Sequence, residues 1–335
     1  MTDTIPLRDA TVAVTGASAG LGRAVVRALG RRGCAVGLIA RDRPRLDAAA
    51  AEVAAAGGRA LALPADVADA EAVENAAAAL EGRFGPIDTW INCAMATVYS
   101  RVADMTAEEF RRVTEVTYLG YVHGTMAALR RMLRRDRGTI VQVGSSLAYR
   151  SIPLQSAYCG AKFAIRGFTD ALRCELIHDR SRVRLTMVQI PAVNTPQFDW
   201  ARNRMGRRPQ PVPPIHQPEP VAEAVVRAAE TAPRELWVDP SSIKVIAGAM
   251  LVPTTLDRLL AARAWEGELT DEPDPPGRSD NLFAPVAGAW GAHGRFDSRA
   301  EQGAPAFSEG LVRGAAAAVG VAALAAAAVG LGTRR

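Results

Sequence analysis

The sequence predicts an α/β fold: a doubly wound parallel sheet of seven strands with helices on both faces, Rossmann-like in its layers. Short, nearly continuous apolar runs alternate with longer stretches that place apolar residues at helical spacing. Strands that are apolar throughout are typical of parallel sheets covered on both sides. A glycine-rich turn joins the first strand to the first helix, as in sheets that bind nucleotides.

The predicted strands cover residues 11–15, 34–40, 59–64, 88–94, 138–145, 182–190 and 234–238. Stretches such as "LGRAVVRALGRRG" and "AEAVENAAAALEGRFG" are the predicted helices between them. We expect one catalytic domain over residues 1–265. Within it, residues 196–220 form a substrate lid that includes the proline-dense loop "RRPQPVPPIHQPEP", because loops this long in a compact domain are usually functional.

Two further segments follow the predicted domain. Residues 266–312 are rich in Gly, Pro and charge and are predicted to form an irregular linker. Residues 313–335 are predicted to form an Ala-rich apolar helix, in which the uncharged stretch 314–332 is long enough for the ~30 Å of a bilayer core. Ten of these nineteen residues are Ala and only two are Leu. A membrane anchor and an Ala-rich helix in water therefore both stay open.

The composition argues against several classes of protein. A net charge of +5, from 40 basic and 35 acidic residues, is too weak and too dispersed for a nucleic-acid partner. The four cysteines form no CxxC pair and no metal-ligand spacing, so we expect reduced thiols and no metal. The N-terminus has no long apolar run and is not a secretory signal, which predicts a cytoplasmic catalytic domain.

The stretch "TGASAGLG" places Gly16, Gly20 and Gly22 between the first strand and the first helix. Glycines allow a tight turn and close backbone approach, and the helix N-terminus offers N–H groups to a pyrophosphate. This predicts a dinucleotide site. At the end of the second strand Arg41 favours NADP(H) over NAD(H), since an arginine there can bind the extra phosphate. Asp42 keeps NAD(H) as an alternative cofactor. If the ribose-binding position lies one residue further along the chain, the Asp42 carboxylate would contact the ribose.

Tyr158 and Lys162 stand four residues apart in a predicted helix and so share one face, a spacing that chance also produces in many helices. Ser145 ends the strand 138–145, thirteen residues before the tyrosine. Ligands of open α/β sheets bind at the carboxyl ends of the strands. We therefore expect strand end and helix to present these polar groups to one crevice.

The motifs "TGASAGLG", "ADV", "INCA", "VGSS" and "YCGAK" together resemble the short-chain dehydrogenase/reductase family over roughly residues 7 to 250. The resemblance implies hydride transfer between NADP(H) and a small-molecule carbonyl or alcohol, in a homodimer or homotetramer. Tyr158 would exchange a proton with the substrate oxygen, with its pKa lowered by Lys162 and the nicotinamide. Ser145 would hydrogen-bond that oxygen, with Ser146 as the alternative serine, and Lys162 would hold the nicotinamide ribose.

The resemblance also implies a set of cofactor contacts: Gly16, Ser18, Gly20, Leu21, Gly22, Arg41, Asp66, Val67, Asn92, Tyr158, Lys162, Pro191 and Thr195. Three segments depart from the family's pattern. Thr117 stands where the family carries a catalytic Asn, "NCAM" replaces N-N-A-G, and "PAVNTP" replaces P-G-x-x-x-T. These departures motivate a rival hypothesis, a non-catalytic NADP-binding sensor or scaffold.

Overall fold

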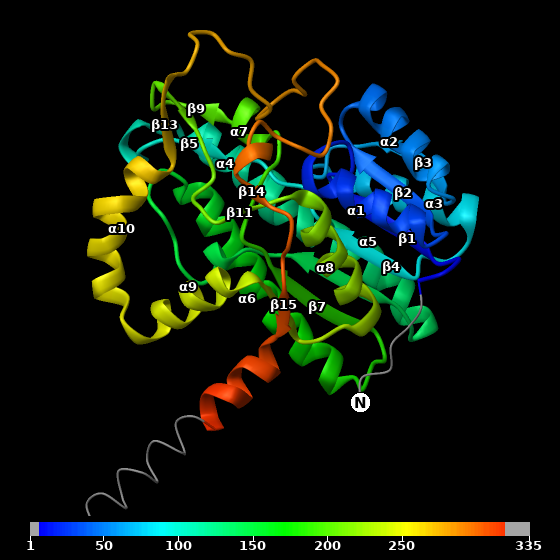
Figure 1. Ribbon diagram of the computed structural model, residues 1–335. Helices are drawn as coiled ribbons and strands as arrows, with labels where there is room; N and C mark the ends of the chain where they lie inside the picture. Colours follow the sequence, from blue (N-terminus) through cyan, green and yellow to red (C-terminus); the bar gives the residue numbers. More distant parts are fainter. Residues whose placement is uncertain (1–6, 319–335) are drawn as a thin grey trace, which may run out of the picture.

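The computed structural model describes residues 7–318, which form an eight-stranded sheet in the order β15-β12-β7-β6-β4-β1-β2-β3 (Figure 1). The strands are β1 (Thr11–Thr15), β2 (Ala35–Ala40), β3 (Arg59–Pro64), β4 (Thr89–Asn92), β6 (Thr139–Val143), β7 (Arg184–Gln189), β12 (Glu235–Val238) and β15 (Ala306–Ser308). All neighbours from β3 to β12 pair in parallel, which confirms the predicted fold class. The seven predicted strands are all present.

Helices cover both faces of the sheet, and each face has its own apolar core. On one face Val25, Leu46 and Val225 bring α1 (Gly20–Arg31), α2 (Arg43–Ala55) and α8 (Pro218–Thr231) into one buried cluster. On the other face, α3 (Ala70–Phe84), α4 (Ala107–Thr114), α5 (Gly120–Arg135) and α6 (Ser156–His178) share a second cluster. The strands between them are buried on both sides, as their continuous apolar sequence requires.

Further strands and helices gather at the carboxyl edge of the sheet. They are β5 (Val98–Tyr99), β8 (Ala192–Val193), α7 (Gln197–Trp200), β9 (Arg202–Asn203), β10 (Arg207–Pro209), β11 (Ile215–His216), α9 (Asp239–Leu251), α10 (Pro253–Gly267), β13 (Leu269–Pro273) and β14 (Ala300–Glu301). The predicted lid, residues 196–220, contains α7 and the short strands β9, β10 and β11.

The segment 266–312 differs from the irregular linker predicted for it. Strand β13 pairs with β10, β14 pairs with β11, and β15 adds an antiparallel edge to the main sheet by pairing with β12. These strands have two to five residues, too few for a visible alternation of apolar and polar residues. Their partners lie far away in the sequence, so local pattern could not predict them.

Within residues 7–318 no helix combines the length and the hydropathy needed to cross a membrane. Most of the proposed anchor, from residue 319 onward, lies outside the described residues.

Candidate active site

A cavity of about 400 Å³ opens at the carboxyl ends of the central strands. It extends from the glycine loop and the end of β2, past Tyr158, to apolar side chains of α9 and α10. The predicted site residues that line it are Gly16, Ser18, Gly20, Leu21, Gly22, Arg41, Asp66, Val67, Ser145, Tyr158, Lys162, Pro191 and Thr195. Asn92 and Thr117 are not among the lining residues.

The glycine loop is shaped by backbone that only glycine tolerates. Gly16 has φ +72°, and a Cβ built there would lie 2.8 Å from the Cα of Ala94. A Cβ on Gly22 would lie 2.2 Å from the carbonyl oxygen of Gly16, well inside van der Waals contact. The two glycines therefore let the loop pack closely on itself and on the chain after β4. The loop and the first turn of α1 line the cavity as a backbone cradle, and helix N–H groups suit a pyrophosphate.

Gly22→Ala is expected to lower the free energy of unfolding by about 1–3 kcal/mol, because the added methyl forces the loop backbone apart. Gly167→Ala is the matched control: Gly167 is exposed on α6, and its Cβ would meet nothing within 4 Å. Denaturant titrations of both variants measure the difference. Equal stability of the two would show that the loop can relax around a side chain.

Arg41 is half-buried at the end of β2, and within residues 7–318 it has no carboxylate partner. Among the described residues its guanidinium donates only to main-chain carbonyls, those of Asn281 (2.5 Å), Phe283 (3.0 Å) and Leu282 (3.4 Å). Burial lowers the pKa of Arg41, and the neighbouring Arg112 and Arg45 lower it further, while Asp66 opposes them. A cation placed in this way favours an anionic ligand.

Both oxygens of the Asp42 carboxylate are hydrogen-bonded at the start of α2. One oxygen caps α2 by accepting from the Arg45 amide (2.8 Å), and the other pairs with the Arg45 guanidinium (2.9 Å). This arrangement favours Arg41 over Asp42 as the residue that distinguishes the cofactors. Asp66, after β3, accepts from the Ala68 amide and forms an ion pair with Arg112.

Ser145, Tyr158 and Lys162 lie together on the wall of the cavity and are at most 9% exposed. Ser145 follows β6, and its hydroxyl accepts from the Leu147 amide at 3.1 Å. Lys162 Nζ donates to the carbonyl of Val143 at 2.7 Å and to the Tyr121 hydroxyl at 3.3 Å. The same Nζ lies 5.5 Å from the centre of the Tyr158 ring.

The sequence predicts that Lys162 and the nicotinamide together lower the pKa of Tyr158; in this wall Lys162 alone does not lower it. Burial raises the pKa of Tyr158 well above that of a free phenol, and a hydrogen-bonding contact with Ser145 opposes the rise. Burial also lowers the pKa of Lys162 to about 8. Both charged forms lose hydration in this wall, so desolvation is the largest influence on the pKa of each group.

Thr117 lies in a π-helical turn, Glu115–Leu119, between α4 and α5. Its hydroxyl donates to the carbonyl of Ala96 and accepts from the amide of the same residue, both at 2.9 Å. The side chain is fully buried and fastens the helix to the loop after β4. The structure therefore gives Thr117 a structural contact, away from the cavity.

Asn92 is likewise directed into the protein core. Its amide nitrogen donates to Gln142 (2.9 Å) and Thr125 (3.1 Å), and its oxygen accepts from the Trp90 indole (2.8 Å). Alternate residues of a strand point to opposite faces, and this side chain points to the α5 side rather than to the cavity. Its role here is to satisfy a buried polar network.

Three residues on the substrate side were not predicted from the sequence. Tyr99 and Gln155 line the cavity, and Gln155 donates to the carboxyl of Glu268 at 2.9 Å. Glu268 is fully buried, and burial raises its pKa to about 8. Within the described part of the chain, neither the second Glu268 oxygen nor the Tyr99 hydroxyl has a hydrogen-bond partner. The sequence did not indicate that Glu268 is buried, because it lies in a charge-rich segment where acidic residues are usually exposed.

The folded chain keeps the Glu268 proton that the unfolded chain releases above about pH 4.5. The contribution of Glu268 to the free energy of unfolding is therefore fully present below about pH 4.5. It falls by roughly 1.4 kcal/mol per pH unit as the pH rises from there towards 8. Glu268→Gln should be progressively more stable than wild type from pH 5 to pH 8 in denaturant titrations. Glu272→Gln, at an exposed acid of β13, is the control. Parallel curves for wild type and Glu268→Gln would contradict the buried acid.

Known proteins resemble this chain in sequence and in fold. A family model described as short chain dehydrogenase matches residues 10–205. The uncharacterized oxidoreductase YxnA of Bacillus subtilis (strain 168) is 30% identical over 279 residues, which cover 83% of this chain and 78% of that protein. The 3-dehydrosphinganine reductase of Danio rerio is 30% identical over 233 residues, 67% of this chain and 70% of that protein.

Among solved structures, an alcohol dehydrogenase from the archaeon Thermococcus sibiricus, complexed with 5-hydroxy-NADP, superposes with a TM-score of 0.58. The two chains are 29% identical, and the match covers 68% of this chain and 95% of the archaeal one.

Proposed function

Because this chain belongs to the short-chain dehydrogenase family, whose members are oxidoreductases that use a nicotinamide cofactor, we propose that it transfers hydride between NADP(H) and a carbonyl or alcohol substrate. The observation that carries the proposal is the single cavity shared by the glycine loop and by Ser145, Tyr158 and Lys162. Hydride transfer and proton transfer act on the same substrate carbonyl. The cofactor loop and the proton-transferring residues must therefore line the same cavity, and these groups do.

Each polar residue of the cavity wall has a separate role in the proposed reaction. A nicotinamide cofactor, when bound, would supply or accept the hydride. With its pKa raised by burial, Tyr158 holds its proton at neutral pH and donates it to the substrate oxygen in the reductive direction. Ser145 donates a hydrogen bond to the same oxygen and stabilises its developing charge. Lys162 supplies a positive charge beside the phenol that stabilises the tyrosinate left after proton transfer.

Arg41 supports NADP(H) as the cofactor. The three carbonyls that it contacts use Nη1 and one hydrogen of Nη2, so Nε and the second hydrogen of Nη2 remain as a fork for a phosphate. The glycine cradle fits the pyrophosphate of the same molecule. The related archaeal dehydrogenase was solved with an NADP derivative, which agrees with this preference.

The substrate end of the cavity favours an apolar carbonyl compound. Its lining includes Val212, Val245, Leu256 and Leu260, from the lid, α9 and α10. The Danio rerio relative is named as a reductase of 3-dehydrosphinganine, which also supports an apolar substrate class.

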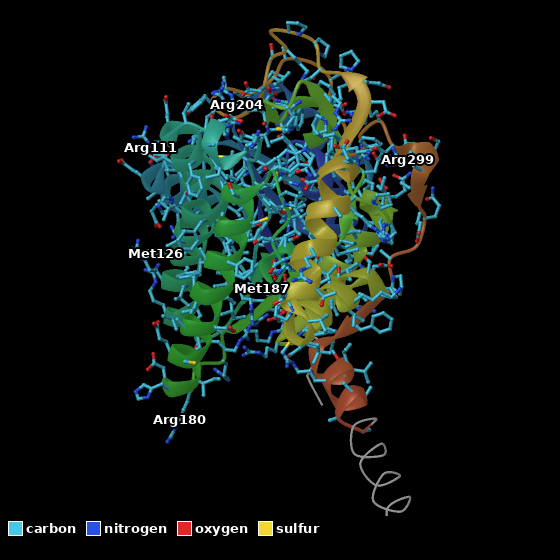
Figure 2. The ribbon with its side chains drawn as sticks, turned by 90° about the vertical axis from the view of Figure 1, so that its left-hand side faces the viewer. Arg111, Met126, Arg180, Met187, Arg204 and Arg299 are labelled. Carbon is cyan, nitrogen blue, oxygen red and sulfur yellow. The ribbon has the colours of Figure 1, made fainter. Side chains whose placement is uncertain are left out.

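A homodimer through the α4–α6 face is part of the proposal. Apolar side chains on these helices are left in solvent: Phe110, Met126, Leu133, Phe163 and Ile177 are each at least 41% exposed. Figure 2 shows Met126 projecting outward from this side of the molecule. Such a patch is typical of a surface that a second copy covers.

The test is NADPH oxidation by the purified full chain against a panel of apolar ketones and aldehydes. We expect turnover with at least one long-chain or cyclic ketone and none with NADPH alone. The rival hypothesis of a sensor or scaffold predicts that NADPH raises the melting temperature while the whole panel gives no turnover.

A further inference from the structure

Residues 278–296, which we term the clasp, cross over the cavity between β13 and β14. The clasp is part of the segment drawn as the loops at the top of Figure 1. Two of its residues, Asn281 and Pro285, line the cavity directly. The clasp therefore lies over the same space that the cofactor proposal assigns to NADP(H).

One end of the clasp contacts the glycine loop and the start of α1. The carbonyl of Gly291 accepts from the amide of Gly20 at 3.0 Å, and the carbonyl of Trp290 accepts from Arg23 at 2.7 Å. The Trp290 ring packs edge to face on Trp200 of the lid, with 5.1 Å between ring centres. These contacts join the clasp to the pyrophosphate cradle and to the lid at once.

The other end of the clasp surrounds Arg41. Leu282 is fully buried in the same apolar cluster as Val67 and Val116, which line the cavity after β3 and before α5. Its carbonyl accepts from Arg112 Nε at 3.1 Å and also from Arg41. The clasp carbonyls accept from Nη1 and Nη2 of Arg41, and among the described residues Nε has no hydrogen-bond partner.

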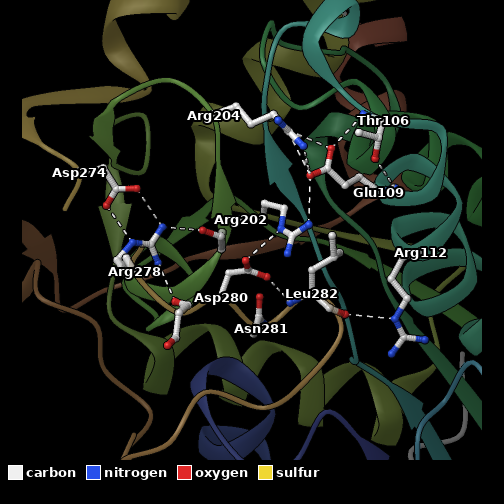
Figure 3. Close-up of polar contacts among 12 residues, drawn as sticks. Thr106, Glu109, Arg112, Arg202, Arg204, Asp274, Arg278, Asp280, Asn281 and Leu282 are labelled. Carbon is white, nitrogen blue, oxygen red and sulfur yellow. Dashed lines mark hydrogen bonds and ion pairs between the residues drawn. The ribbon is translucent and has the colours of Figure 1, made fainter. Parts of the chain in front are cut away.

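An ion-pair chain holds the clasp to the rest of the molecule (Figure 3). Arg202 donates to Asp280 of the clasp at 2.9 Å and to Glu109 of α4 at 3.2 Å. Glu109 is 1% exposed and also accepts from Arg204 at 2.8 Å. At the start of the clasp Arg278 donates to the carbonyl of Ala201 at 2.7 Å. Partly buried, multiply bonded pairs of this kind hold their geometry better than exposed single pairs.

We infer that the clasp is the outer wall of the NADP(H) site, and that its Asp280–Arg202–Glu109 attachment controls how fast the cofactor leaves. A dinucleotide in the cavity has the glycine loop beneath it and the clasp above it. Release then requires the clasp to lift, and the attachment opposes that movement. This inference rests on the proposed use of NADP(H). It adds that the clasp is the segment that retains the bound cofactor.

Asp280→Asn tests the attachment, since it removes the charge that pairs with Arg202 and keeps an oxygen for the Leu282 amide. In stopped-flow displacement of NADPH from the full chain, the dissociation rate should rise about tenfold, in line with the loss of one charge-assisted contact. The kcat at saturating NADPH should stay within about threefold. Glu272→Gln removes an exposed charge from the neighbouring β13 and should change the dissociation rate less than twofold.

Hydrogen exchange gives a second measurement. It uses the wild-type chain, so it does not depend on whether a variant folds correctly. NADPH should slow amide exchange within residues 278–296 by about tenfold or more, because the bound cofactor holds the clasp closed. NADPH binding with no protection of the clasp, or with an unchanged dissociation rate in Asp280→Asn, would overturn this inference alone. A wild-type chain that binds no NADPH would overturn the proposed cofactor as well.

Discussion

Tyr158→Phe is expected to lower kcat by about 10³-fold while the Kd for NADPH changes no more than about threefold. The phenol is the group that lines the cavity beside Ser145 and Lys162, and its burial keeps the proton available for transfer to the substrate oxygen. Phenylalanine retains the ring and its packing and removes only the hydroxyl. The measurement is steady-state NADPH oxidation with the best ketone of the panel, together with fluorescence titration of NADPH.

Tyr149→Phe is the matched control for that variant. The Tyr149 hydroxyl donates to Glu235, and the residue does not line the cavity, so kcat should remain within about twofold. A Tyr158→Phe enzyme with the kcat of wild type would remove the tyrosine from the mechanism and leave proton transfer to another group.

Arg41→Ala is expected to raise the KM for NADPH by about 50-fold and the KM for NADH by less than about fivefold. The large effect is the loss of a paired, charge-assisted contact with a phosphate that NADH lacks, worth roughly 2–3 kcal/mol. The small effect is the loosening of the clasp, whose carbonyls also lose a donor. The ratio of the two KM values therefore isolates the phosphate contact.

Arg43→Ala supplies the control for Arg41, since Arg43 is exposed two residues away and its one ion pair within residues 7–318 is with Asp47. It should leave both KM values within about twofold. Equal increases in the two KM values for Arg41→Ala would mean that the guanidinium only holds the clasp and does not recognise a phosphate.

The sequence contained enough information for the sheet and for the centre of the candidate site. Runs such as "TVAVT" have apolar residues at successive positions, which is typical of strands in a covered parallel sheet. The glycine loop and the Tyr158–Lys162 pair are local signals, because each depends on spacing within one element. The structure places them on one cavity because the carboxyl ends of parallel strands meet at one edge.

The sequence could not predict features that depend on distant partners. The clasp and Glu268 belong to a segment whose composition resembles a linker, and they become ordered through contacts with residues such as Arg41, Arg202 and Gln155. The pKa of Tyr158 depends on burial, which no spacing rule gives. Asn92 was assigned by motif alone, and only the structure shows its side chain satisfied within the core.

Strand β15 also bears on how this protein behaves at high concentration. Without it, β12 would end the sheet with a row of unpaired N–H and C=O groups along Leu236–Val238, beside a buried apolar face. Open strand edges of this kind template pairing between molecules and promote aggregation. The three residues of β15 pair with that row, so the sheet ends on this side in a strand of only three residues, and very short edge strands limit such pairing. The chain beyond the family match therefore also supplies the strand that closes this side of the sheet.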